Sequence, residues 1–149
     1  LISQYNYSMF NRTPEVDTIP LAAANGSGFI CFSPLQQGLL TDRYLNGIPE
    51  NSRAARSTGF LQLDQVTDKR IEAARKLNEI AKRRGQSLAQ MALAWVLRDE
   101  RVTSVIIGAS SVQQLDNNLH TIDNLEFTAQ ELLEIDQILI DPELSFLQK

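Results

Sequence analysis

The chain has 149 residues, with 14 Lys and Arg against 18 Asp and Glu, one His and one Cys. A hydrophobic fraction of 43% and a net charge of −4 exclude disorder over most of the chain and predict one domain with a hydrophobic core. The single cysteine excludes an internal disulfide and a multi-cysteine zinc site. The mild acidity disfavours general nucleic-acid binding, and no apolar run approaches the roughly 18 residues of a membrane span. Without a secretory signal at its start, the protein is expected to be cytoplasmic.

The N-terminal part alternates strand-like and helix-like segments. Residues 1–7 predict a strand, and residues 15–24 predict a helix that ends at the Gly-rich segment 25–28. Residues 29–32 are a compact apolar run, typical of a strand buried on both faces. Residues 35–64 predict one long loop, whose length favours a functional role. Because the chain begins with Leu1 and not Met, we expect it to be cut from something longer.

The C-terminal part predicts mostly helices. Apolar residues at spacings of three and four predict a helix over residues 67–84, with Gly85 as its C-cap. Capping-box patterns at residues 87–90 and 128–131 predict the starts of two more helices. Residues 103–107 predict another buried strand, and residues 111–122 another helix. The tail after Asp141 is expected to be loosely held.

Strands separated by helices indicate an α/β fold with a parallel sheet. The patterns predict about three strands and five helices, with no internal repeat and no linker between domains. Three strands buried on both faces are few for a complete sheet, so the chain is expected to be part of a larger one.

Two segments combine strand ends with residues that suit ligand binding. Phe32 follows a strand, where an aromatic ring can stack on a flat ligand or simply end the strand. Residues 108–111 lead into a helix, where small residues can admit a phosphate or serve only as a cap. If these residues serve only as a helix cap, either Ser110 with Gln113 or Ser111 with Gln114 forms it. Arginines 43, 53 and 56 of the long loop either bind phosphate or are solvated.

The remaining chemically suggestive residues favour structural roles. His120 lies late in a predicted helix and near no second cluster of ligand-type residues. Cys31 lies in a predicted buried strand, and Trp95 lies on an apolar helix face. The basic run at residues 82–84 complements the C-terminal dipole of its helix. The scattered carboxylates indicate a solvated surface, so we expect no metal site and no catalytic pair of carboxylates.

Several motifs resemble the aldo-keto reductase superfamily. They are FSPL at 32–35, GLLTDRY at 38–44, GIP at 47–49 and QMALAWVL at 90–97. The most specific is VTSVIIGAS at 102–110, followed by Gln114-Leu115 and Asn117-Asn118. Together they are similar to the branch that contains potassium-channel β subunits and bacterial glyceraldehyde 3-phosphate reductases. The resemblance implies that residues 1–149 are the C-terminal part of a (β/α)₈ TIM barrel, from strand six to the final helices.

The resemblance also implies a cofactor site for NADP(H). Gln4 matches a glutamine that binds the nicotinamide carboxamide, and Phe32 matches the aromatic residue that stacks on the nicotinamide ring. The segment Ser33, Pro34 and Leu35 matches the pyrophosphate cradle, and Arg43 and Arg53 match positions near the phosphates. The residues matched to the 2′-phosphate and adenosine are Gly108, Ser110, Gln114 and Asn118.

Two positions depart from the family pattern. Asn117 stands where Glu is frequent, and Asn51 stands where the channel subunits have Tyr. The family's catalytic Asp, Tyr, Lys and His belong to the N-terminal half, so the resemblance implies no catalytic residue in this chain.

Three functions follow as hypotheses. The chain is the cofactor-binding half of an NADP(H)-dependent reductase of small aldehydes or ketones, a non-catalytic NADP(H)-binding regulatory module, or a half-barrel that self-associates. Its expected partner is the missing N-terminal half or a second copy of the chain.

Overall fold

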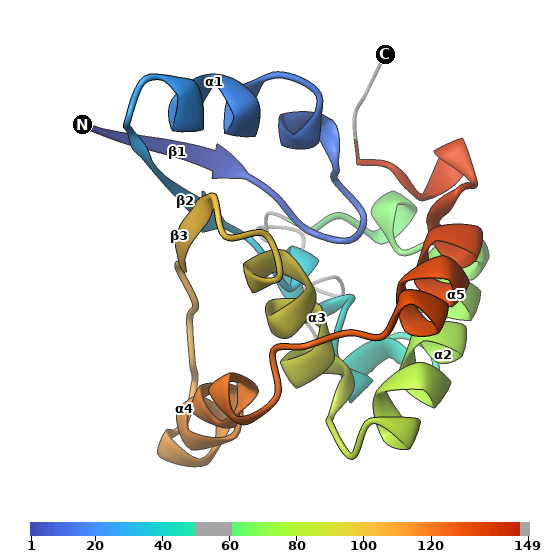
Figure 1. Ribbon diagram of the computed structural model, residues 1–149. Coiled ribbons are helices and arrows are strands. Elements are labelled where there is room, and N and C mark those ends of the chain that lie inside the picture. The colour runs from blue at the N-terminus through green and yellow to red at the C-terminus, as the bar shows by residue number, and fades with distance from the viewer. Residues whose placement is uncertain (50–60, 147–149) are drawn as a thin grey trace.

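The strands form one parallel three-stranded sheet, which lies at one side of the molecule (Figure 1). The computed structural model describes residues 1–49 and 61–146. Within them, β1 (Ile2–Asn6), β2 (Gly28–Phe32) and β3 (Val102–Val105) pair in the order β1-β2-β3, with every neighbour parallel. The expected strands and their parallel pairing are therefore confirmed, although β3 ends at Val105, two residues before its predicted end.

Helices connect these strands and cover one face of the sheet. The α-helices are α1 (Thr18–Ala24), α2 (Asp68–Arg83), α3 (Leu88–Leu97), α4 (Val112–Leu119) and α5 (Ala129–Leu139). Short 3₁₀ turns are η1 (Thr13–Glu15), η2 (Gln36–Gly38), η3 (Asp42–Tyr44), η4 (Leu63–Gln65), η5 (His120–Asp123) and η6 (Pro142–Leu144). The predicted helix over residues 15–24 is thus shorter than expected, and the described part of the long loop contains three such turns.

Local capping interactions determine where three of these helices begin. The Thr67 side chain accepts a hydrogen bond from the Arg70 amide at the start of α2. Ser87 with Gln90 and Thr128 with Glu131 form reciprocal capping boxes at the starts of α3 and α5. These contacts satisfy amides that have no partner within the helix, so the predicted capping patterns are confirmed.

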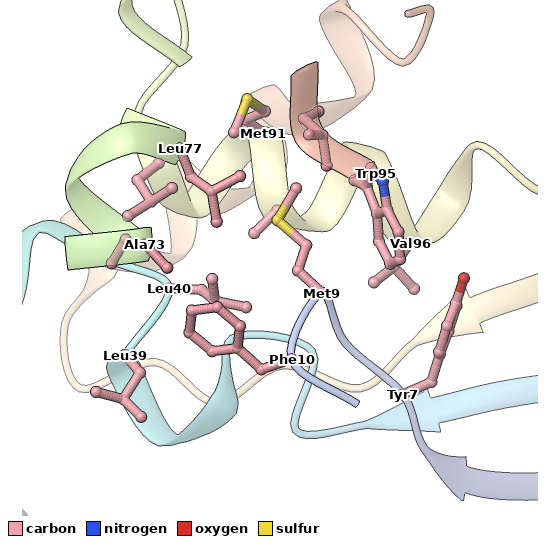
Figure 2. Close-up of a cluster of buried hydrophobic side chains, with 14 of the residues drawn as sticks. Tyr7, Met9, Phe10, Leu39, Leu40, Ala73, Leu77, Met91, Trp95 and Val96 are labelled. Carbon is pink, nitrogen blue, oxygen red and sulfur yellow. The ribbon is translucent and has the colours of Figure 1, made fainter. Parts of the chain in front are cut away.

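One face of the sheet is covered and the other is not. Phe29 and Cys31 of β2 are fully buried on the covered face. Figure 2 shows the core continuing from Tyr7 to Trp95 of α3, and on to Leu77 of α2. Burial raises the pKa of the Cys31 thiol to about 12, so the thiol stays protonated and unreactive.

The opposite face of the sheet is largely exposed, which contradicts the prediction of strands buried on both faces. Phe32 is 38% exposed, Ile30 is half-buried, and Ser104 of β3 is exposed. Side chains alternate between the faces of a strand, and the described helices cover only one face. The apolar runs predicted the strands correctly, but they did not reveal that one face lacks a covering layer here.

A charged network joins the end of β1 to the helices. The Tyr7 hydroxyl donates to Glu15 Oε1 at 2.7 Å, and Arg98 donates to the Tyr7 oxygen at 3.2 Å. Arg12 pairs with Glu15 at 2.8 Å and with Asp136 of α5 at 2.6 Å. Burial alone would raise the Glu15 pKa, but hydrogen bonds from Arg12 and Tyr7 outweigh it and lower that pKa. This network ties segments distant in sequence into one unit.

The C-terminal segment is docked, not loosely held as expected. Leu144 is buried, and the Phe146 amide donates to the Phe10 carbonyl at 3.2 Å. The Arg70 guanidinium donates to the carbonyls of Leu144, Ser145 and Gln65, and it stacks 3.8 Å over the Phe146 ring. Arginine 70 is itself buried, and its desolvation there lowers its pKa. The tail was misjudged because its partner lies 74 or 75 residues away in the sequence.

Candidate functional site

Two predicted cofactor residues lie on the uncovered face near the carboxyl edge of the sheet. In the β1–β2 register, Gln4 pairs with Ile30, and Asn6 pairs with Phe32. Gln4 and Phe32 therefore project from the same face, about one strand apart. Both side chains are exposed, and the register sets Gln4 diagonally across from Phe32 on the neighbouring strand. Ligands gather at this edge in parallel α/β folds.

The turn after β2 has an unusual backbone. Ser33, Gln36 and Gln37 adopt positive φ angles of 54°, 46° and 57°, although none is glycine. The Ser33 hydroxyl accepts a hydrogen bond from Gln37 Nε2 at 3.2 Å. Non-glycine residues with this geometry gather at functional sites, where the surroundings hold them. The sequence selected Ser33, Pro34 and Leu35 by resemblance, but it gave no signal of this strain.

The loop before α4 is open and ends in a cap. An added Cβ at Gly108 would meet no atom within 4 Å. The Ser110 amide and hydroxyl both donate to Gln114 Oε1, at 2.7 and 2.9 Å. Ser111 caps α4 by accepting from the Gln114 amide at 3.1 Å. Of the two predicted capping pairs, Ser111 with Gln114 is therefore the observed cap. The two Ser110 donors instead bond the side-chain oxygen Gln114 Oε1.

The remaining predicted site residues differ in their surroundings. Arg43 is exposed in η3, where its amide donates to Thr41 Oγ1 at 3.2 Å. Asn118 is only 3% exposed, and its Nδ2 has no acceptor within the described part of the chain. Asn117 donates to Ser87 Oγ and accepts from Gln90, so it joins α4 to α3. Arg53 lies outside the described residues, together with Asn51 and Arg56.

The surroundings of His120 and Trp95 fit structural roles. His120 is exposed and contacts Asp123 at 2.8 Å, an interaction that raises the His120 pKa. Trp95 is fully buried beneath the guanidinium of Arg98. Within residues 1–49 and 61–146, no cluster of His, Cys, Asp and Glu could hold a metal ion. No helix in the same residues is long and apolar enough to cross a membrane.

Two shallow grooves lie away from the predicted site. One, of about 550 Å³, lies between α2 and α5 and includes Ile80, Ile138 and Leu144. The other, of about 580 Å³, includes Leu97 and Phe127. Gln4 and Phe32 instead lie on the open face of the sheet, and neither residue lines one of these grooves.

The parallel β/α units and the residues gathered at the carboxyl edge define part of a (β/α)₈ barrel protein. Residues 1–140 match the profile of the Aldo/keto reductase family, and the chain belongs to that family. It is 47% and 46% identical to L-glyceraldehyde 3-phosphate reductases of Escherichia coli O157:H7 and K12, over 99% of the chain. It is also 36% identical, over 91% of the chain, to a putative voltage-gated potassium channel β subunit of Schizosaccharomyces pombe.

The chain spans less than half the length of these relatives, 44% of each reductase and 40% of the channel subunit. Solved structures agree on the fold. An aldo-keto reductase of Bacillus halodurans in its holo form superposes with a TM-score of 0.68 at 24% identity. That match covers 93% of this chain and 42% of the other. A thermostable aldo-keto reductase in complex with the inhibitor epalrestat gives 0.63 at 24% identity, covering 92% and 39%. The expected barrel fragment is thereby confirmed.

Proposed function

We propose that this chain is the NADP(H)-binding part of an aldo-keto reductase that reduces small aldehydes or ketones. The observation that carries the proposal is the placement of Gln4 and Phe32 on one exposed face, beside the left-handed turn at Ser33. A reductase of this kind needs a flat platform for a nicotinamide ring and a polar group that fixes the orientation of the ring.

Phe32 and Gln4 would hold the nicotinamide. The exposed Phe32 ring offers a π-face on which the nicotinamide can stack. The Gln4 side chain carries both a donor and an acceptor, which can pair with a carboxamide in either sense. Such a pair fixes which face of the ring is directed toward the substrate.

Backbone amides and arginines would hold the phosphates. The pyrophosphate would lie against Ser33, Pro34 and Leu35, with Arg43 and Arg53 supplying positive charge. The 2′-phosphate of NADP(H) would lie between Gly108 and the start of α4. There the two Ser110 donors already converge on an oxygen, Gln114 Oε1, which a phosphate oxygen can replace. Asn118 would lie near the adenine, where its unpaired Nδ2 could find an acceptor after a small side-chain movement.

The cofactor would supply the hydride that reduces the carbonyl carbon, and this chain would bind and orient the cofactor. The proton for the carbonyl oxygen would come from the N-terminal half of the barrel, to which the resemblance assigns the family's catalytic Asp, Tyr, Lys and His. The carbonyl substrate would likewise meet residues beyond these 149. Location in the cytoplasm remains a prediction.

The second candidate function is a regulatory module that binds NADP(H) without turnover. The similarity to a putative channel β subunit favours it, since the same cofactor residues would serve both functions. Turnover of a small aldehyde by a protein that also contains the complementary half of the barrel would distinguish the reductase from the module.

Self-association is the third candidate. Val112, Leu115, Leu119 and Ile122 form an exposed apolar stripe over α4 and η5, at spacings of three and four residues. Such a surface needs either the complementary half of the barrel or a second copy to cover it. The solution mass of the chain separates these two possibilities.

The primary test is a fluorescence titration of the chain with NADPH, with NADH as the competing cofactor. We expect saturable binding that strongly prefers NADPH, and Phe32→Ala should weaken it about tenfold by removing the stacking surface. Tyr5→Ala is the matched control, because Tyr5 is an exposed aromatic residue on the opposite face of the sheet. The proposal fails if the chain binds neither cofactor, or if both variants change the affinity equally.

A further inference from the structure

The left-handed turn after β2 needs a physical cause. Ser33, Gln36 and Gln37 lie within five consecutive positions, and each has a positive φ. The Cβ of any residue other than glycine is crowded in this region. These residues could adopt many backbone conformations with a negative φ and no strain. The positive φ angles therefore persist only where contacts with the rest of the fold stabilise them.

A buried hydrogen bond supplies that selection at Gln36. The Ser8 hydroxyl donates to Gln36 Oε1 at 2.9 Å, between residues 28 positions apart. Ser8 is fully buried, and Gln36 is only 4% exposed. Water therefore has little access to the Gln36 carboxamide, and a turn that moved it away from Ser8 would leave a buried acceptor unpaired.

Ser8 is itself held rigidly, so it can act as a fixed reference point. Its amide donates to the Asn11 carbonyl at 3.1 Å, and the Asn11 amide donates back to the Ser8 carbonyl at 3.0 Å. The Asn11 side chain donates to the Asn6 carbonyl at the end of β1, at 3.0 Å. Ser8 is thus tied through Asn11 to the end of β1, in the sheet that carries Gln4 and Phe32.

The conformation of Gln36 controls how the turn presents its amides. Leu35 has φ −97° and ψ 8°, and Gln36 follows it with φ 46°. Backbone of opposite handedness at successive residues directs amides toward a common point, where an anion can bind. The Gly38 and Leu40 amides donate to the Leu35 carbonyl at 3.0 and 3.2 Å. The Gln36 amide donates to the Ser33 carbonyl at 2.9 Å, whereas the Leu35 amide has no backbone acceptor in the described part of the chain.

We propose that Ser8 is a positioning residue, which holds the turn 33–38 through Gln36 in the conformation that directs the Leu35 amide toward the pyrophosphate of the cofactor. This inference rests on the proposed function, because it assumes a dinucleotide at this edge. In this proposal Ser8 does not contact the cofactor. It acts through its hydrogen bond to Gln36 Oε1, which is made only when Gln36 has its left-handed backbone conformation.

Glycine provides a test that separates positioning from simple packing. Glycine adopts a φ near +46° without strain, so a Gln36→Gly chain no longer needs Ser8 to hold the turn. Gln36→Ala loses the same hydrogen bond but keeps a Cβ that disfavours this φ. If Gln36 only filled space, the glycine variant would be the more damaging of the two, because it removes more atoms and adds backbone freedom.

The experiment measures affinity for two ligands, NADPH and adenosine 2′,5′-bisphosphate, which lacks the pyrophosphate bridge. The variants are Ser8→Ala, Ser8→Thr, Gln36→Ala and Gln36→Gly. Gln86→Ala is the control for lost stability, because Gln86 is a buried glutamine that bonds the Asn124 carbonyl at 2.9 Å, away from the turn. Amide hydrogen exchange at Gly38 and Leu40 is measured in parallel without any ligand.

We expect Ser8→Ala and Gln36→Ala to weaken NADPH binding about tenfold while leaving the bisphosphate affinity within about twofold, since one buried hydrogen bond is lost in each. Ser8→Thr and Gln36→Gly should bind NADPH nearly as the unsubstituted chain does. Exchange at Gly38 and Leu40 should accelerate in Ser8→Ala and not in Gln86→Ala.

Two results would overturn the inference while leaving the proposed function intact. One is NADPH affinity that is unchanged in Ser8→Ala. The other is a Gln36→Gly variant that binds no better than Gln36→Ala. If the unsubstituted chain bound neither ligand, the proposed function would fail and this inference with it. Unchanged hydrogen exchange at Gly38 and Leu40 in Ser8→Ala would also refute the inference, independently of any ligand.

Discussion

Replacing Arg70 tests the finding that the C-terminal segment is docked. Its guanidinium donates to three backbone carbonyls, at 3.2 Å for Leu144, 2.7 Å for Gln65 and 2.7 Å for Ser145. Each such bond contributes about 1 kcal/mol net, so Arg70→Ala should lower the free energy of unfolding by about 3 kcal/mol. The stacking on Phe146 adds up to about 1 kcal/mol. Lysine has one ammonium group in place of the planar fork, so Arg70→Lys should lose about half as much.

Urea denaturation at pH 7 measures this loss. With a slope of about 2 kcal/mol per molar urea, Arg70→Ala should lower the midpoint by about 1.5 M. Arg75→Ala is the matched control on the same helix, because Arg75 is exposed and bonds one carbonyl, that of Leu45, at 2.7 Å. That control should lose less than about 1 kcal/mol. Equal losses in the two alanine variants would refute the argument that the three carbonyl bonds of the buried Arg70 guanidinium hold the C-terminal segment in place.

Two further predictions concern titrating groups. The pKa of Glu15 is lowered in the folded chain, so its contribution to stability is present above the ordinary value of 4.5 and is lost as the pH falls through the folded pKa. The stability difference between the unsubstituted chain and Glu15→Gln, followed by urea midpoints from pH 7 to pH 3, should shrink in that window, and a constant difference would contradict the assignment. The Cys31 thiol, with its pKa raised to about 12 by burial, should not react with a disulfide reagent at pH 8 until urea unfolds the chain. Reaction at the rate of a free thiol in the native state would show that β2 is accessible.

Local sequence patterns predicted the elements well because both partners of each contact lie close together in the chain. The capping boxes at Ser87 and Thr128 join residues three positions apart, so their pattern is visible in the sequence. The cap at Ser111 needed the structure, because Ser110 offered an equally good pattern.

The parts that could not be predicted depend on contacts between distant residues. The Ser8–Gln36 bond and the docking of the tail on Arg70 join residues 28 to 75 positions apart, with no periodic signal. Resemblance selected Gln4 and Phe32, and the strand register then placed them on one face. The positive φ of Ser33 follows from the three-dimensional surroundings of the turn, which a pattern of residue types does not record.

Side chains along β2 point alternately to the core and to the open face, so successive residues of this strand are constrained in different ways. Phe29 and Cys31 face the core, so their replacement changes whether the chain folds. Ile30 and Phe32 face the open side, so their replacement leaves the core intact. Over evolutionary time, substitutions on the open side can therefore change the proposed cofactor face without first being compensated for lost stability. At the proposed site, a strand of five residues would thereby let binding specificity diverge while the scaffold stays constant.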